Sequence, residues 1–181
     1  MTDNVPILFV LGPSGAGKTT LGEWVEEDLH FLWIELDRWM ETDGVDQANL
    51  RPEWNELMDR CQAGAIAKTL RARVLEKGAH GAILTFSSRL VFSTSQLASL
   101  EHAGIRVLVL YGSQEDCLAA FLKRERESGR NLPKEHWLGN NFDTHERLGN
   151  PIYERYCLQV FQAGRFLDRA TLMAAVKKHI G

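Results

Sequence analysis

The chain has 181 residues, 44% of them hydrophobic and 25% charged, a length and composition typical of one folded domain. These values exclude a disordered tail protein, a collagen and a small disulfide scaffold. The formal net charge of −3 argues against binding to nucleic acid or to a membrane through bulk charge. No run approaches the ~18 apolar residues that span a bilayer, the N-terminus is unlike a signal peptide, and the three cysteines have no metal or disulfide spacing. We therefore expect a cytoplasmic protein with free thiols.

Short apolar runs alternate with longer amphipathic stretches along the chain. Four runs are almost continuously apolar, as in parallel strands covered on both faces, and they span residues 5–11, 30–36, 81–86 and 105–111. Apolar residues at helical spacing predict helices at about 21–29, 51–77, 94–102 and 113–122, and in the stretch that ends at 180. Residues 165–167 are the predicted fifth strand. This alternation predicts an α/β fold with three layers, α/β/α, and a five-stranded parallel sheet in a single domain of residues 1–181.

The stretch Gly12-Pro-Ser-Gly-Ala-Gly-Lys18-Thr19 matches the phosphate-loop pattern G-x-x-x-x-G-K-[ST] in full, between an apolar run and an amphipathic stretch. Its glycines allow close approaches that a Cβ would block, so that backbone N–H groups can surround phosphate oxygens. The pattern predicts bound ATP, with Lys18 as a catalytic charge on its phosphates and the Thr19 hydroxyl as a Mg²⁺ ligand. The predicted nucleotide contacts here are Gly12, Pro13, Ser14, Gly15, Ala16, Gly17, Lys18, Thr19 and Thr20. A kinase, a hydrolase and a nucleotide switch are all compatible with this pattern.

Two carboxylates end the second apolar run, Glu35 and Asp37, and residues two apart in a strand share a face. One could hold a Mg²⁺ water and the other could face a substrate hydroxyl. We expect their strand to lie next to the phosphate-loop strand, which would put Asp37 at the crevice where the γ-phosphate points. The alternative is structural, with Asp37 capping the following turn and Glu35 as a charge on an edge strand.

Basic residues follow the third and fourth apolar runs. Arg89 would point into the same crevice and could bind an anionic group of the substrate, or it is a solvated arginine. The charged, glycine-bearing segment 124–145 is the predicted lid, since phosphoryl transfer needs cations around the transferred group. Ordinary ion pairing along a helix is the alternative for its charges.

These features together resemble the small P-loop kinases of metabolites, namely shikimate kinase, gluconate kinase and chloramphenicol phosphotransferase. Glu35-Leu36-Asp37 is similar to the Asp-x-Asp of shikimate and gluconate kinases. The resemblance implies that Asp37 contacts the substrate hydroxyl and that Glu35 helps to hold Mg²⁺. Arg130-Asn-Leu-Pro133 is similar to the shikimate kinase lid, which implies that Arg130 reaches the phosphates and that Arg124 packs on adenine. Ser87-Ser88-Arg89 and Phe142-Asp-Thr144 are similar to gluconate kinase segments.

The resemblance implies an ATP-dependent kinase that transfers the γ-phosphoryl group to a hydroxyl of a small polar metabolite, such as a sugar acid or a polyol. We expect a monomer or a homodimer without nucleic-acid or membrane partners. The glycine-rich end of the third strand in shikimate kinase is absent here, which argues against shikimate as the acceptor. The alternatives are a nucleoside or nucleotide kinase, and an ATP-binding module or NTPase that transfers nothing.

Overall fold

The centre of the molecule is a parallel β-sheet with the strand order β2-β3-β1-β4-β5. The structure, a computed structural model, describes residues 5–36, 45, 48–86 and 88–181. The sheet strands are β1 Ile7–Leu11, β2 Leu32–Leu36, β3 Ala82–Phe86, β4 Ile105–Tyr111 and β5 Cys157–Gln159. All four neighbouring pairs are parallel, so the predicted five-stranded parallel sheet is confirmed.

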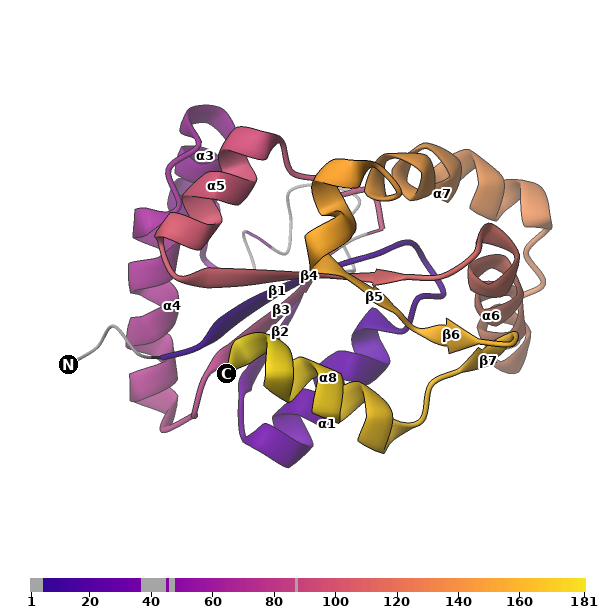
Figure 1. The fold of residues 1–181 in the computed structure, drawn as a ribbon, viewed down its shortest axis with the longest axis horizontal. Helices are drawn as coiled ribbons and strands as arrows, with labels where there is room; N and C mark the ends of the chain where they lie inside the picture. The colour runs from indigo at the N-terminus through magenta and orange to yellow at the C-terminus, as the bar shows by residue number, and fades with distance from the viewer. Residues whose placement is uncertain (1–4, 37–44, 46–47, 87) are drawn as a thin grey trace.

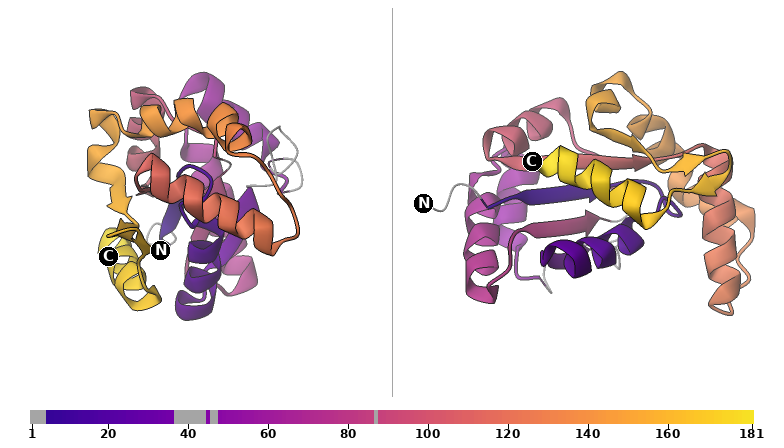
Figure 2. Two further views of the ribbon diagram at one scale, coloured as in Figure 1. Left: turned by 90° about the vertical axis from the view of Figure 1, so that its right-hand side faces the viewer. Right: turned by 60° about the horizontal axis from the view of Figure 1, so that its bottom comes forward.

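Helices cover both faces of the sheet and complete the predicted three layers (Figure 1). The face that carries α3, α4 and α5 is opposite the face that carries α1 and α8, while α6 and α7 lie together beyond one end of the sheet (Figures 1 and 2). The helices are α1 Lys18–Leu29, α3 Arg51–Arg60, α4 Gly64–Lys77, α5 Thr94–His102, α6 Gln114–Glu127, α7 Lys134–Leu148 and α8 Arg169–Ile180, with a 3-10 helix, η1, at Pro151–Tyr156. None of the described helices is long and apolar enough to cross a membrane.

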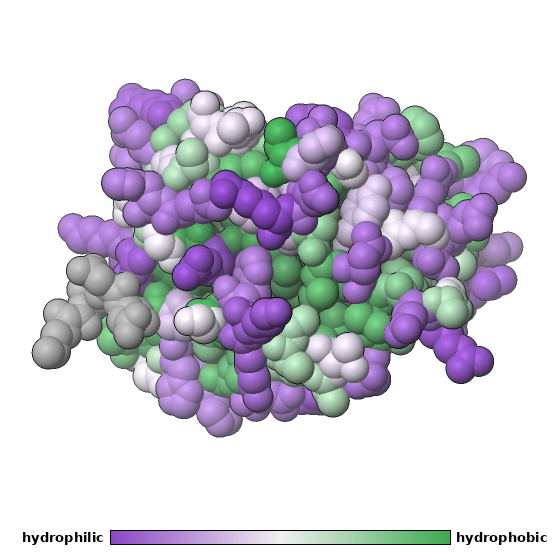
Figure 3. Space-filling model, viewed as in Figure 1, coloured by the Kyte–Doolittle hydropathy of each residue, from purple (hydrophilic) through white to green (hydrophobic). Residues whose placement is uncertain are grey.

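The central strand β1 explains why the apolar runs are continuous. All five of its side chains are fully buried. Ile7, Phe9 and Leu11 belong to the core beneath α4 and α5, and Leu8 and Val10 belong to the core beneath α1 and α8. Alternate side chains of a strand point to opposite faces, so a strand between two helical layers needs apolar residues throughout. On the outside, hydrophilic residues surround a middle region where hydrophobic residues show (Figure 3).

The prediction of residues 165–167 as the fifth sheet strand is wrong. Strand β7, Arg165–Phe166, instead pairs antiparallel with β6, Phe161–Gln162, in a separate two-stranded sheet. The fifth strand of the main sheet is β5, which adds to β4 only along Val109–Tyr111. A three-residue strand carries too little apolar pattern to be found without its partner.

Two further expectations about the layout are corrected. The helix predicted over 51–77 is broken into α3 and α4 by Cys61, which has a left-handed backbone with φ of 53°, and the Ala63 N–H donates to Ser99 Oγ at 2.8 Å. Strand β2 does not lie next to the phosphate-loop strand, because β3 lies between it and β1. The crossover from β1 through α1 therefore passes over β3 before the chain enters β2.

Candidate active site

The phosphate-loop stretch connects β1 to α1 at the carboxyl end of the central strand. Helix α1 begins at Lys18, and its cap, Gly17, offers no side chain to the first N–H groups of the helix. There is also no acidic residue in the first turn. The positive end of the helix dipole is therefore left for an anion from outside, in a loop whose sequence is suited to phosphate.

Two positions of the loop require glycine, because neighbouring atoms leave no room for a Cβ. A Cβ on Gly15 would lie 2.0 Å from the carbonyl oxygen of Cys117 in α6, and a Cβ on Gly17 would lie 2.4 Å from the ring of Phe166. Both residues also have positive φ, of 90° and 85°. Burial raises the pKa of the Cys117 thiol to about 12, so the residue behind the loop is a neutral packing group and not a nucleophile.

The polar groups of Lys18 and Thr19 have different partners. The Lys18 side chain is buried, and its Nζ donates to the carbonyls of Gly12 at 2.9 Å and Pro13 at 3.1 Å. The Thr19 hydroxyl donates to Glu35 Oε1 at 3.1 Å. The structure therefore brings together Thr19 and Glu35, the two predicted Mg²⁺ ligands, although β2 is not the neighbour of β1. The predicted catalytic and substrate residue Asp37 lies outside the described residues.

A cavity of about 360 Å³ opens beside the loop. It is lined by Gly15, Gly17, Lys18, Thr19, Thr20, Trp24, Ala120, Arg124 and Phe166. Arg124, expected to pack on adenine, lies on it, and so do two aromatic side chains, Trp24 and Phe166, that sequence reasoning did not assign to the site. Their ring centroids are 6.4 Å apart. The sequence pattern of residues 165–167 predicts only a sheet strand, and the helical spacing of Trp24 predicts only a core residue, so neither pattern indicates a place in the site.

One buried carboxylate holds both arginines that the sequence assigned to ATP. The Glu125 side chain is 3% exposed. It accepts hydrogen bonds from Arg124 Nε at 3.2 Å and Nη2 at 3.0 Å, and its other oxygen lies 2.7 Å from Arg130 Nε. Arg124 also lies over the ring of Phe121, 5.3 Å from its centroid. Glu125 thus orients both arginines. The sequence alone predicted only ordinary i,i+4 ion pairing along the helix for this residue.

Replacing Glu125 by glutamine should lower the free energy of unfolding by about 1.5–3 kcal/mol, because hydrogen bonds to a charged, buried group are lost. Glu127 is the matched control, since it lies on the same helix, is 64% exposed and pairs with Lys123 at 3.8 Å. Glu127→Gln should cost roughly 0.5 kcal/mol or less. Urea unfolding of both variants measures the difference, and equal effects would show that burial gives Glu125 no special role.

The rest of the predicted lid is the loop after α6 and most of α7. Helix α7 is anchored to the body of the protein: Trp137 and His145 are buried, and His145 Nε2 donates to the Gly112 carbonyl at 2.8 Å. Arg89, the predicted substrate residue, donates a hydrogen bond to Asn140 Oδ1 of this helix. The connection 128–133 joins α6 to α7 and carries Arg130, whose N–H donates to the Glu125 carbonyl at 2.8 Å.

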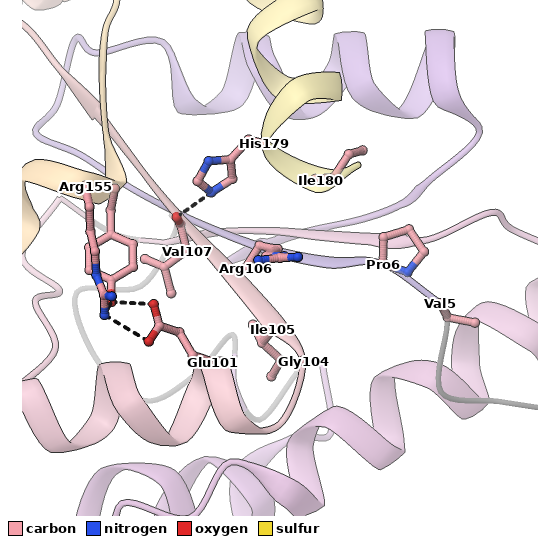
Figure 4. Close-up of a pocket in the computed structure, with 11 residues that line it drawn as sticks. Val5, Pro6, Glu101, Gly104, Ile105, Arg106, Val107, Arg155, His179 and Ile180 are labelled. Atoms are coloured by element: carbon pink, nitrogen blue, oxygen red, sulfur yellow. Dashed lines mark hydrogen bonds and ion pairs between the residues drawn. The ribbon is translucent and has the colours of Figure 1, made fainter.

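A second cavity, of about 480 Å³, is lined by residues none of which belongs to the phosphate loop (Figure 4). It opens at the amino ends of β1 and β4, whereas ligands of open parallel sheets bind at the carboxyl ends. Two of its basic groups are engaged: Arg155 pairs with Glu101 at 2.9 Å, and His179 Nε2 donates to the Val107 carbonyl at 2.8 Å. The smaller cavity beside the phosphate loop is therefore the candidate nucleotide site.

The known proteins to which this chain is similar include several kinases. No family model matches the chain. Shikimate kinase 2 from Escherichia coli and from Shigella flexneri is 30% identical over 105 residues, which are 56% of this chain and 60% of the relative. The chain thus matches about three fifths of the length of these relatives.

Solved structures match along nearly the whole chain. A sugar kinase from Janibacter sp. HTCC2649 has a TM-score of 0.58 with 21% identity, and covers 97% of this chain and 94% of its own. A gluconokinase from Sinorhizobium meliloti 1021 has a TM-score of 0.53 with 19% identity, over 98% and 90%. A shikimate kinase from Acinetobacter baumannii has 0.51 with 20% identity, over 99% and 97%. The chain therefore has the fold of the P-loop kinases and is similar in sequence to one of them, shikimate kinase.

Proposed function

We propose that the protein is an ATP-dependent kinase that phosphorylates a hydroxyl group of a small, polar and anionic metabolite. The single observation that carries this proposal is the complete phosphate-loop motif, with Lys18 buried in it and Thr19 bonded to Glu35, next to a cavity lined by aromatic and basic side chains. The similarity to shikimate kinase in sequence and to sugar kinases in fold supports it.

The cavity beside the loop suits the base of the nucleotide. Phe166 and Trp24 supply apolar ring faces, and the Arg124 guanidinium, held by Glu125, is a flat cation that stacks on aromatic systems. The phosphates would then lie at the N-terminus of α1, against the backbone N–H groups of the loop and Lys18.

Thr19 and Glu35 fit a magnesium ion. A hydroxyl and a carboxylate are hard oxygen ligands of the kind that Mg²⁺ takes, and these two meet at 3.1 Å beside the loop. When bound, the metal would neutralise charge on the phosphates. The resemblance to shikimate and gluconate kinases places Glu35 where those kinases have an aspartate, and its carboxylate reaches Thr19 although β3 lies between β2 and β1.

The chain's own residues would act mainly by position and charge. Lys18 stabilises the transferred group, and Arg130 reaches it after leaving Glu125, to which its Nε is bound at 2.7 Å in the ligand-free protein. Asp37 accepts the hydrogen bond of the acceptor hydroxyl and orients it for in-line attack. Arg89 binds the anionic group of the acceptor, which favours a sugar acid over a neutral polyol.

The proposal is tested by measuring ADP release with ATP, Mg²⁺ and one acceptor at a time, over sugar acids, polyols, shikimate, nucleosides and nucleoside monophosphates. We expect acceptor-dependent ADP release with one or a few sugar acids. Release with nucleosides alone would assign a nucleoside kinase, and release that no acceptor stimulates would assign an NTPase.

A further inference from the structure

Helix α7 binds the backbone of the phosphate loop through two buried side chains. Trp137 Nε1 donates to the Ser14 carbonyl at 2.9 Å, and the Ser14 N–H donates to Asn141 Oδ1, also at 2.9 Å. Trp137 is completely buried and Asn141 is 3% exposed. Both backbone polar groups of one loop residue are therefore held by side chains more than 120 residues later in the chain.

These contacts act on a glycine-rich part of the phosphate loop. Gly15, directly after Ser14, has positive φ, and so does Gly17. A glycine-rich segment loses much backbone entropy when it is ordered, so a loop that is ordered only by its ligand binds that ligand more weakly. Anchoring Ser14 before the ligand arrives reduces this loss.

The geometry of Asn141 itself is fixed within α7. Its Nδ2 donates to the Trp137 carbonyl one helical turn earlier, at 3.2 Å, which directs Oδ1 toward Ser14. The preceding residue, Asn140, has a different partner, because its Oδ1 accepts from Arg89. Adjacent asparagines on one helix thus contact the phosphate loop and the residue proposed to hold the acceptor.

We infer that Asn141, together with Trp137, is a positioning residue that preorganises the phosphate loop for the phosphates of the nucleotide. The identity of the ligand rests on the proposed function, whereas the anchoring of Ser14 does not. If Asn141 served only to pack α7 against the body of the protein, an apolar residue of its size would replace it without effect on the loop.

The test is hydrogen exchange of the peptide that spans residues 12–17, in the full-length protein without ligand, combined with ADP affinity by calorimetry. Asn141→Leu keeps the size and removes the acceptor. It should speed exchange in this peptide and weaken ADP binding, each by about tenfold, the factor expected for one lost hydrogen bond. Asn141→Asp keeps an acceptor oxygen and should retain slow exchange. Asn140→Ala, the matched control, should leave both quantities unchanged.

Unchanged exchange in a folded Asn141→Leu protein would overturn the inference. If that variant fails to fold, Trp137→Phe serves instead, since it keeps a ring in the core and removes the donor to Ser14; slow exchange would count against the inference there too. If no form of the protein binds ADP, the proposed function fails, while the exchange rates still decide whether Asn141 orders the loop.

Discussion

Replacement of Lys18 by alanine should lower kcat by about 100-fold or more, because the transition state loses a preorganised positive charge in a site shielded from water. In the ligand-free protein this ammonium group is buried and donates to the Gly12 and Pro13 carbonyls. The Lys18 ammonium group is thus already placed within the loop. When the nucleotide binds, it would exchange the carbonyl oxygens of the loop for phosphate oxygens. Steady-state kinetics with saturating ATP and acceptor measures the loss.

The control for this variant is Lys123→Ala, because Lys123 is 72% exposed and pairs with Glu127 on the surface of α6. It should keep wild-type turnover. Circular dichroism and thermal unfolding should show that both variants are folded. Wild-type turnover by a folded Lys18→Ala protein would remove Lys18 from the mechanism.

Asp37→Asn is expected to leave ATP affinity nearly unchanged and to lower acceptor phosphorylation by about 100-fold, because asparagine keeps the size and loses the charge that orients the acceptor hydroxyl. Asp37 follows Leu36, the last residue of β2, and Glu35 two residues earlier bonds to Thr19 of the phosphate-loop helix. Asp37 is therefore two residues away in sequence from a side chain that is already at the site.

A capping role for Asp37 leads to a different result, since asparagine caps a helix almost as well as aspartate. Activity and stability would then both survive the exchange. ATP binding by calorimetry and acceptor-dependent ADP release separate the two roles. Phosphate transfer by Asp37→Asn at the wild-type rate would mean that Asp37 does not orient the acceptor.

The fold was predictable where the signal is local. The four apolar runs became strands: β1 and β3 are fully buried, β4 almost entirely, and the edge strand β2 is half-buried. The helix predicted to begin at Ser113 is also present as α6, and the Ser113 Oγ caps it by accepting the Asp116 N–H at 3.0 Å. The failures concern partners that are distant in sequence. Strand β5 exists only through pairing with β4, and the break at Cys61 uses a left-handed residue that is not glycine.

The candidate site shows the same difference between residues with a local sequence signal and residues whose partners are distant in sequence. The phosphate loop is a contiguous motif, so its residues were predictable one by one. The bonds of Ser14 to Trp137 and Asn141 have no local signature, because they join residues that come together only when α7 is placed over the loop. The same holds for Phe166, whose contact with Gly17 depends on the short sheet of β6 and β7.

The contact between Gly15 and α6 constrains how this sequence can evolve. The space in which a side chain at position 15 would begin is occupied by the Cys117 carbonyl, which belongs to a helix backbone and cannot rotate away. The constraint is therefore independent of which nucleotide or acceptor the protein uses. A lineage that changed its substrate could vary Arg89, whereas a new residue at position 15 would first require α6 to move, and Arg124 and Glu125 would move with it.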